Sequence, residues 1–117
     1  LAKENFEHVV VMQPHEPAAH YNLGLAEAGL HDWRSAAENY AAALHEDPSR
    51  VDAARELAIT DEKLHRHDQA MAVYGKLKAR ADACGDSCAD AGELAPAVKA
   101  VETALSLPAA SGGRPAG

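Results

Sequence analysis

The strongest constraint on the fold of this 117-residue chain is a spacing of 34 residues that recurs over its first two thirds. Side chains of similar size and chemistry return at this interval, and three columns appear three times. A period of this length is typical of repeat architectures, in which neighbouring units bury a shared core. The recurring positions are Ala2, Ala36 and Ala70; Phe6, Tyr40 and Tyr74; Val9, Ala43 and Leu77; Pro14 and Pro48; Leu23 and Leu57; and Leu30 and Leu64.

Each unit has the pattern of two helices joined by a short turn. Leu23, Glu27 and Leu30 are spaced by four and three residues, which places them on one face of a helix. Ala36, Tyr40 and Ala43 repeat that pattern after a turn at residues 29–32, and the Pro at position 48 prevents the second helix from continuing. The sequence therefore predicts an all-α fold built from helical hairpins.

The stretch AHYNLGLAEAGLHDWRSAAENYAAALHEDPSR resembles a tetratricopeptide repeat, whose pattern is Trp-x-x-Leu-Gly-x-x-Tyr, then Ala-x-x-x-Phe, then Pro. The matching residues are Leu23, Gly24, Ala36, Tyr40 and Pro48. Two positions depart from the pattern, because His20 replaces the Trp and Glu27 replaces the Tyr. The resemblance implies a right-handed α-solenoid of antiparallel helix pairs.

This alignment divides the chain into six segments, of which the first matches only the second helix of a unit. We therefore expect the chain to start in mid-repeat and to form the C-terminal end of a larger protein or assembly. The predicted segments are a truncated repeat (1–16), two full repeats (17–50 and 51–83), a Cys-containing loop (84–92), a capping helix (93–107) and a disordered tail (108–117). A degenerate second helix of a third repeat is the competing description of 93–107, and Pro96 is expected in the first turn of that helix.

Composition argues against several classes of function. The net charge is -7, with 18 acidic and 11 basic residues and no cluster of basic ones, so a nucleic-acid partner is disfavoured. Apolar runs, such as residues 9–12, are far shorter than the roughly 20 residues that span a bilayer, so direct membrane insertion is not expected. There is no nucleophile motif and no Gly-rich phosphate loop. We expect neither enzymatic activity nor a cofactor.

Cys84 and Cys88, the two cysteines, flank a short Gly-containing stretch. They could form a local disulfide, which would imply an oxidising compartment such as the periplasm, or an exported protein. Reduced thiols are the main alternative, and half of a metal site is a weaker one because structural zinc needs four ligands.

The seven histidines and the single Trp are given ordinary structural roles. The histidines are scattered over unrelated repeat positions, so they are interpreted as solvated surface residues and no metal site is predicted. Trp33 opens the second helix of the first full unit and is expected to pack in the core, as are Phe6, Tyr40 and Tyr74.

In the tetratricopeptide family, the first helices of successive repeats line a concave groove that binds a peptide or protein segment. Asn22 is the most informative match, because the family often places an Asn there to bond a ligand's backbone. The groove residues that the resemblance implies are Tyr21, Asn22, Leu25 and Ala28 from the first full repeat, and Asp52, Arg55, Glu56, Ile59 and Glu62 from the second.

The best-known subclass of the family grips the acidic tails of chaperones with a basic clamp. In that subclass the clamp positions carry positive charge, whereas in this chain Asp52 and Glu56 occupy two of them. Binding of an acidic chaperone tail is therefore disfavoured. We expect instead a protein-interaction scaffold that binds an apolar segment flanked by a basic group. The alternative is a thiol- or metal-binding accessory module that uses Cys84 and Cys88.

Overall fold

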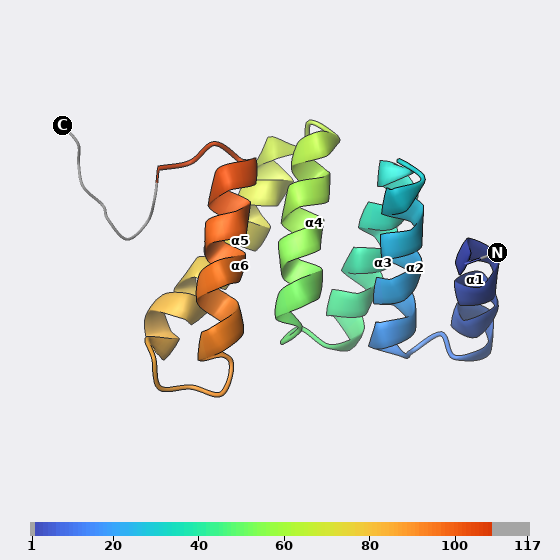
Figure 1. Ribbon diagram of the computed structural model, residues 1–117, viewed down its shortest axis with the longest axis horizontal. Helices are drawn as coiled ribbons and strands as arrows, with labels where there is room; N and C mark the ends of the chain where they lie inside the picture. The colour runs from blue at the N-terminus through green and yellow to red at the C-terminus, as the bar shows by residue number, and fades with distance from the viewer. Residues whose placement is uncertain (1, 109–117) are drawn as a thin grey trace.

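The computed structural model describes residues 2–108 and shows an all-α chain in which consecutive helices pack against one another (Figure 1). The described part is elongated, with extents of 50 × 31 × 20 Å. Its helices are α1 (Ala2–Met12), α2 (Pro17–Gly29), α3 (Trp33–Glu46), α4 (Val51–Lys63), α5 (His67–Cys84) and α6 (Ala91–Ala104). The predicted hairpin turn at 29–32 and the helix end before Pro48 are both confirmed. The predicted disordered tail lies outside the described residues, apart from Pro108.

The helices form two layers. Figure 1 shows α2, α4 and α6 in a front row, with α3 and α5 behind them. Each of α2 and α4 packs against the helix that follows it, and α3 also packs against α4, so the hairpins are connected through successive contacts. We call α2, α4 and α6 the first helices.

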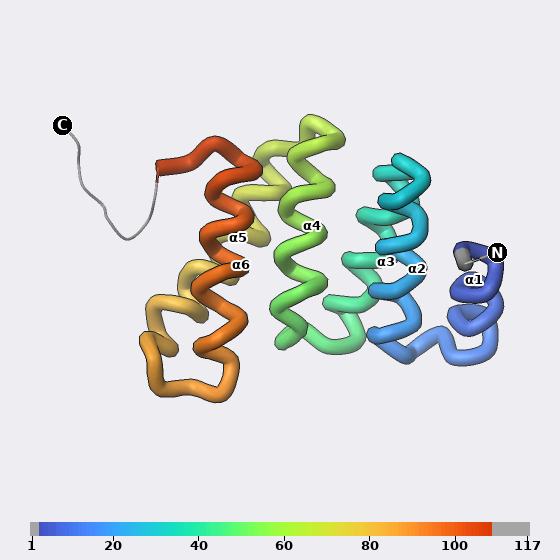
Figure 2. The backbone as a smooth tube through the Cα atoms, viewed as in Figure 1, coloured from blue at the N-terminus to red at the C-terminus, as the bar shows by residue number. Residues whose placement is uncertain are grey.

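The first helices end in the same backbone turn. Their carboxyl ends are followed by His31, His65 and Ser106, all with φ close to +60°. Around each turn, one amide bonds a carbonyl five residues earlier: Asp32 to Glu27, Arg66 to Asp61, and Leu107 to Glu102. This is the hydrogen-bond pattern of a Schellman cap, which satisfies the last carbonyls of a helix. The three turns lie at one edge of the molecule (Figure 2).

The same three turns place α6 in the series of first helices. The carbonyl that accepts the cap bond comes from Glu27, Asp61 and Glu102, which are 34 and 41 residues apart. α6 packs against both α4 and α5, as a first helix of a third unit would. In its cap and its contacts α6 is therefore similar to α2 and α4 rather than to α3 and α5, which does not fit the description of 93–107 as a second helix. Most of the seven extra residues lie in the longer α5 and the loop that follows it.

The expected position of Pro96 is also wrong. α6 begins at Ala91, two residues earlier than predicted, so Pro96 lies inside the helix and beyond its first turn. Pro has no amide hydrogen to donate to the carbonyl four residues earlier, on Gly92. Burial of Leu94, Val98 and Val101 on one face of α6 holds the helix together across this missing bond.

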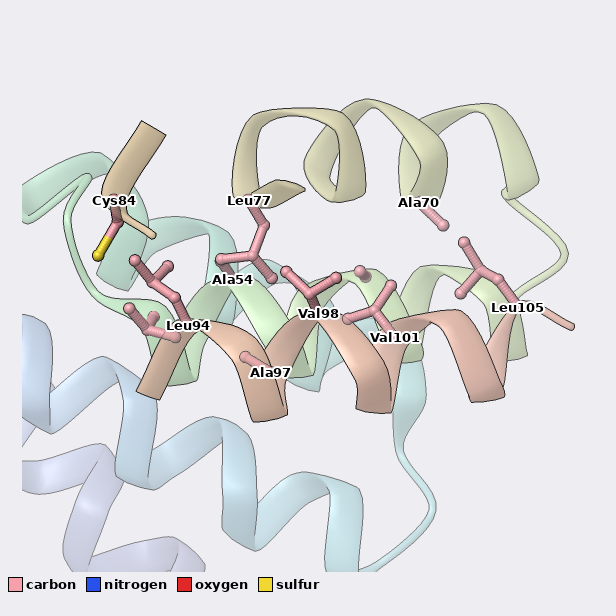
Figure 3. Packing of buried hydrophobic residues seen from close by; sticks show 11 residues of the cluster. Ala54, Ala70, Leu77, Cys84, Leu94, Ala97, Val98, Val101 and Leu105 are labelled. Carbon is pink, nitrogen blue, oxygen red and sulfur yellow. The ribbon is translucent and has the colours of Figure 1, made fainter. Parts of the chain in front are cut away.

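The larger of two buried clusters joins α4, α5 and α6. Leu77 projects from α5 towards Val98 and Val101 of α6, and the small residues Ala54 and Ala58 of α4 let the three helices approach closely (Figure 3). The second cluster contains Ala36, Ala37 and Tyr40 of α3 together with Leu57 of α4. The partly buried side chains of Leu44 and Val73 pack against both clusters and so link them.

Trp33 does not belong to either buried cluster, which corrects the expectation that it packs in the core. Its half-buried ring stacks on the His31 ring at 5.3 Å between centroids, and Lys63 Nζ lies 5.0 Å from its centroid. A cation over an indole ring is favourable at a partly exposed site. Tyr40 is fully buried as expected, whereas Phe6 and Tyr74 are half-buried.

Cys84 and Cys88 form a disulfide, with their Cα atoms 5.3 Å apart. Cys84 is the last residue of α5 and is buried in the larger cluster, while Cys88 is exposed in the loop. Gly85, with φ of +55°, ends the helix and turns the chain back towards Cys84. The disulfide therefore fixes the start of the loop that leads to α6.

Candidate interaction surface

The residues that the resemblance assigned to a groove fall on α2 and α4, and none of them is fully buried. Asn22 and Leu25 on α2 are exposed, and Leu25 keeps 41% of its surface accessible to solvent. The others are half-buried: Tyr21, Ala28, Asp52, Arg55, Glu56, Ile59 and Glu62. We call this set the α2–α4 face.

Tyr21 connects the two helices of the face. Arg55 Nη2 donates to Tyr21 Oη at 3.4 Å, across the 34-residue spacing between units. The guanidinium of Arg50 lies 5.1 Å from the centre of the Tyr21 ring, and the Tyr40 ring contacts it at 5.8 Å between centroids. Burial, followed by the negative charge of Asp52, raises the pKa of Tyr21. Its hydroxyl is therefore protonated at neutral pH.

Each carboxylate of the α2–α4 face lies beside an arginine or a histidine side chain. Asp52 accepts two hydrogen bonds from Arg50, at 3.0 and 2.8 Å, which lower the pKa of its carboxyl group. Glu56 pairs with Arg55 at 2.9 Å. Glu62 lies 2.8 Å from a ring nitrogen of His67, which is charged only when protonated. These contacts compensate much of the negative charge that the residue types alone had suggested for this end of the groove.

Arg50 belongs to this site although its role was not predicted from the repeat pattern. It precedes the first turn of α4 and holds Asp52 with its guanidinium while covering the Tyr21 ring. The sequence Arg50-Val51-Asp52 at a predicted helix start was a usable signal for the ion pair. Its contact with Tyr21 depends on the packing of two units and has no local signal.

The two departures from the tetratricopeptide pattern, His20 and Glu27, are joined through one residue of α3. Asn39 of α3 donates from Nδ2 to the buried carboxylate of Glu27 at 2.7 Å, and its Oδ1 lies 3.2 Å from His20 Nδ1. The other ring nitrogen of His20 donates to the Pro14 carbonyl at 2.7 Å. Burial raises the pKa of Glu27, and the bond from Asn39 opposes that effect. A polar chain thus occupies positions where the pattern has two large aromatic residues, and it ties the loop before α2 to α3.

His20 is accordingly half-buried and hydrogen-bonded, which differs from the expected solvated surface position. The other histidines are exposed: His8, His15, His31, His45, His65 and His67.

Within residues 2–108, no three His, Cys, Asp or Glu side chains are grouped closely enough to hold a metal ion together. Over the same range, no helix combines the length and the apolar character needed to cross a bilayer.

Comparison with known proteins gives no relative. No protein-family model matches the chain, and neither a curated protein nor a solved structure does.

A cleft of about 470 Å³ lies away from the α2–α4 face, between α3 and α5 with α4 as its floor. None of the groove residues implied by the resemblance lines it. The molecule thus carries two separate surface features, the α2–α4 face and this cleft.

Proposed function

We propose that this chain is a tetratricopeptide-type scaffold that binds a protein segment on its α2–α4 face. The observation that carries the proposal is the position of Tyr21, whose half-buried ring on α2 is fixed by Arg50 and Arg55 at the start of α4. An aromatic anchor held in position by its neighbours binds with a smaller loss of conformational entropy than a mobile side chain.

The geometry of the helix ends supports the repeat assignment. Identical caps after α2 and α4, 34 residues apart, give the two units the same turn as well as the same sequence pattern. Tandem units of this kind build extended surfaces for partner segments. The chain acts as a binding scaffold with no chemistry of its own.

The partner segment that fits this face is apolar and flanked by a basic residue. Leu25 and Ile59 offer apolar contact, while Asn22 can exchange hydrogen bonds with a peptide backbone. Asp52, Glu56 and Glu62 disfavour an acidic segment such as a chaperone tail. Because these carboxylates are paired within the chain, the basic flank contributes less to affinity than the apolar contacts do.

The exposed apolar residues of α1 support a role within a larger assembly. Val11 and Met12 keep 76% and 68% of their surfaces exposed, and α1 packs against α2 alone among the described helices. Apolar side chains grouped at one end of a repeat array are normally covered by a neighbouring unit or subunit.

A displayed library of peptides, with apolar cores and varied flanks, tests the proposal directly. We expect selection of apolar segments with Lys or Arg at one end, and loss of their binding in Leu25→Glu and Asn22→Ala. Leu30→Glu is the matched control, because Leu30 is an exposed Leu at the end of the hairpin and outside the α2–α4 face. Equal binding by all three variants and the wild-type chain would remove the face from consideration.

The second candidate, a thiol module, is favoured by one observation, the Cys84–Cys88 disulfide with its exposed Cys88. The buried position of Cys84 against the α4–α6 core suits a structural staple better than a thiol that must be attacked repeatedly. Titration of free thiols in unfolded protein, purified without reductant, distinguishes the two. A structural staple predicts no free thiol, and rapid exchange with glutathione would favour the module.

A further inference from the structure

The cleft between α3 and α5 has apolar walls and a basic rim. α3 and α5 make no substantial contact with each other, so the floor formed by α4 remains open between them. The apolar lining residues are Ala41, Leu44, Pro48, Ala54, Leu57, Ala72, Val73 and Leu77. A volume of about 470 Å³ is within the range of small-molecule sites, roughly 300–1,000 Å³.

All the ionisable residues that line this cleft are basic: His45, Lys76 and Arg80. Their grouping contrasts with the rest of a chain that has 18 acidic residues and a net charge of -7. The exposed Lys76 side chain takes part in no hydrogen bond or ion pair within residues 2–108. Its charge is therefore available to an incoming anion.

Arg80 contributes differently, because its guanidinium is already held. Nη1 donates to the Ser49 carbonyl at 3.2 Å, and Nη2 pairs with Asp90 at 2.9 Å. These two contacts fix the basic group at the edge of the cleft. Lys76 is then the residue that can pair with a ligand, because the charge of Arg80 is already compensated by Asp90.

The lining also indicates which kind of anion fits. An extended peptide placed here would bring backbone amides that need acceptors, whereas Lys and Arg side chains only donate. A helix satisfies its own amides but is about 10–12 Å across, so it could lie only over the mouth. An acyl chain has no backbone polar groups, and a terminal carboxylate accepts the hydrogen bonds that Lys76 offers.

We propose that this cleft is a binding site for a small amphipathic carboxylate, whose acyl chain lies against Leu44, Leu57 and Val73 and whose carboxylate pairs with Lys76. The site is independent of the proposed scaffold function, because it involves none of the α2–α4 face residues.

Three probes with the same tail separate charge from hydrophobicity: decanoate, decanol and decyltrimethylammonium, each below its micelle concentration. Calorimetric titration of the full chain should show saturable binding of one decanoate per chain, weaker binding of decanol and none of the cation. Absence of saturable decanoate binding, or equal binding of the cation, would overturn the proposal.

Variants locate the site. Ala72→Phe places a ring in the cleft from an exposed position of α5 and should abolish binding, while Lys76→Glu should weaken it roughly five-fold or more. Lys99→Glu makes the same charge change on α6, outside the cleft, and should leave the affinity unchanged. Circular dichroism checks that each variant is folded, and Ala72→Leu replaces the Phe variant if that one is not. Equal weakening by Lys76→Glu and Lys99→Glu would show non-specific attraction and contradict the proposal.

Discussion

The backbone of Gly24 lies so close to the Tyr40 ring that a Cβ at position 24 would be 2.6 Å from Cε1 and 2.8 Å from Cδ1. Tyr40 is fully buried and cannot move away without disturbing the α3–α4 cluster. Gly24 is therefore required for steric reasons. The corresponding position of the next unit is Ala58, so the close approach is particular to the first full unit.

Replacement of Gly24 by Ala is expected to destabilise the fold even though Ala is the better helix former. We expect the free energy of unfolding to fall by roughly 1–3 kcal/mol, because the ring must shift within a packed core. Gly75→Ala is the matched control, since a Cβ there meets nothing within 4 Å, and it should stabilise α5 by roughly 0.5–1 kcal/mol. Urea denaturation followed by circular dichroism measures both, and a stabilised Gly24→Ala would contradict the predicted clash.

The two equivalent tyrosines should respond in opposite ways to loss of their hydroxyl groups. Tyr74 Oη donates to the buried carboxylate of Glu102 at 2.7 Å, and burial together with this bond raises the pKa of Tyr74 to about 12. Tyr40 Oη is buried without a hydrogen-bond partner in the described part of the chain. We expect Tyr74→Phe to cost roughly 1–3 kcal/mol of stability, because it leaves a buried carboxylate unpaired. Tyr40→Phe should leave the stability unchanged or raise it by up to about 1 kcal/mol.

Comparison of the two unfolding midpoints tests this difference. A loss in Tyr40→Phe as large as that in Tyr74→Phe would show that the Tyr40 hydroxyl has a stabilising partner after all.

The buried carboxylate of Asp61 should lower stability at neutral pH. Burial raises its pKa, and Arg66 at 3.7 Å opposes that shift only in part. The native state therefore retains a proton that the unfolded chain releases near the ordinary Asp pKa of about 3.9. The free energy of unfolding therefore falls as the pH rises from the ordinary Asp pKa through the raised pKa that Asp61 has in the folded state. Asp61→Asn removes the titration and should raise the free energy of unfolding at neutral pH by roughly 1 kcal/mol, a gain that disappears in acid.

Asp52 provides the opposite case for comparison. The hydrogen bonds from Arg50 lower the pKa of Asp52. The stabilisation that Asp52 provides is therefore present above the ordinary Asp pKa, and it is lost as the pH falls through the lowered pKa of the folded state. Asp52→Asn should therefore lower stability at neutral pH, with the difference vanishing in acid. Unfolding of both variants by urea across the acid range checks the two signs, and parallel pH profiles would contradict the assignment.

Loss of the disulfide should have a moderate effect. The bond closes a short loop, for which chain entropy predicts about 2 kcal/mol of stabilisation. Cys88→Ser should lose that amount, because Cys88 itself is exposed. Cys84→Ser should lose more, since it also places a hydroxyl in the apolar cluster. Denaturation with and without reductant checks this, and reductant should have no effect on either variant.

The locations of the helices could be predicted from local signals. The 34-residue recurrence, the turn residues at 29–32 and the Pro at position 48 specified the units, their two helices and the boundary between them. For α6, the 34-residue register was shifted by seven residues, mostly in the longer α5 and the loop after it, so the period did not predict where α6 packs. The helical periodicity of α6 could be recognised in the sequence, but its packing beside α4 could not.

The candidate site was likewise only partly predictable from the sequence. The positions of Tyr21, Leu25 and Ile59 on the first helices followed from their register in the repeat. The contacts of Tyr21 with Arg50 and Arg55, and the chain from His20 through Asn39 to Glu27, join residues between 12 and 34 positions apart. Such contacts depend on the distance between packed helices, which no local pattern encodes.

By itself, the sequence determined the helical hairpins, their period and the absence of a basic or membrane-spanning stretch, because these depend on neighbouring residues and on composition. Only the tertiary structure decided that Gly24 accommodates the Tyr40 ring, that the carboxylates of the α2–α4 face are paired, and that α3 and α5 leave a basic cleft over α4. The physical reason is that steric fit, charge pairing and empty volume are properties of surfaces brought together by packing. They are set by the distances between helices that are far apart in the chain.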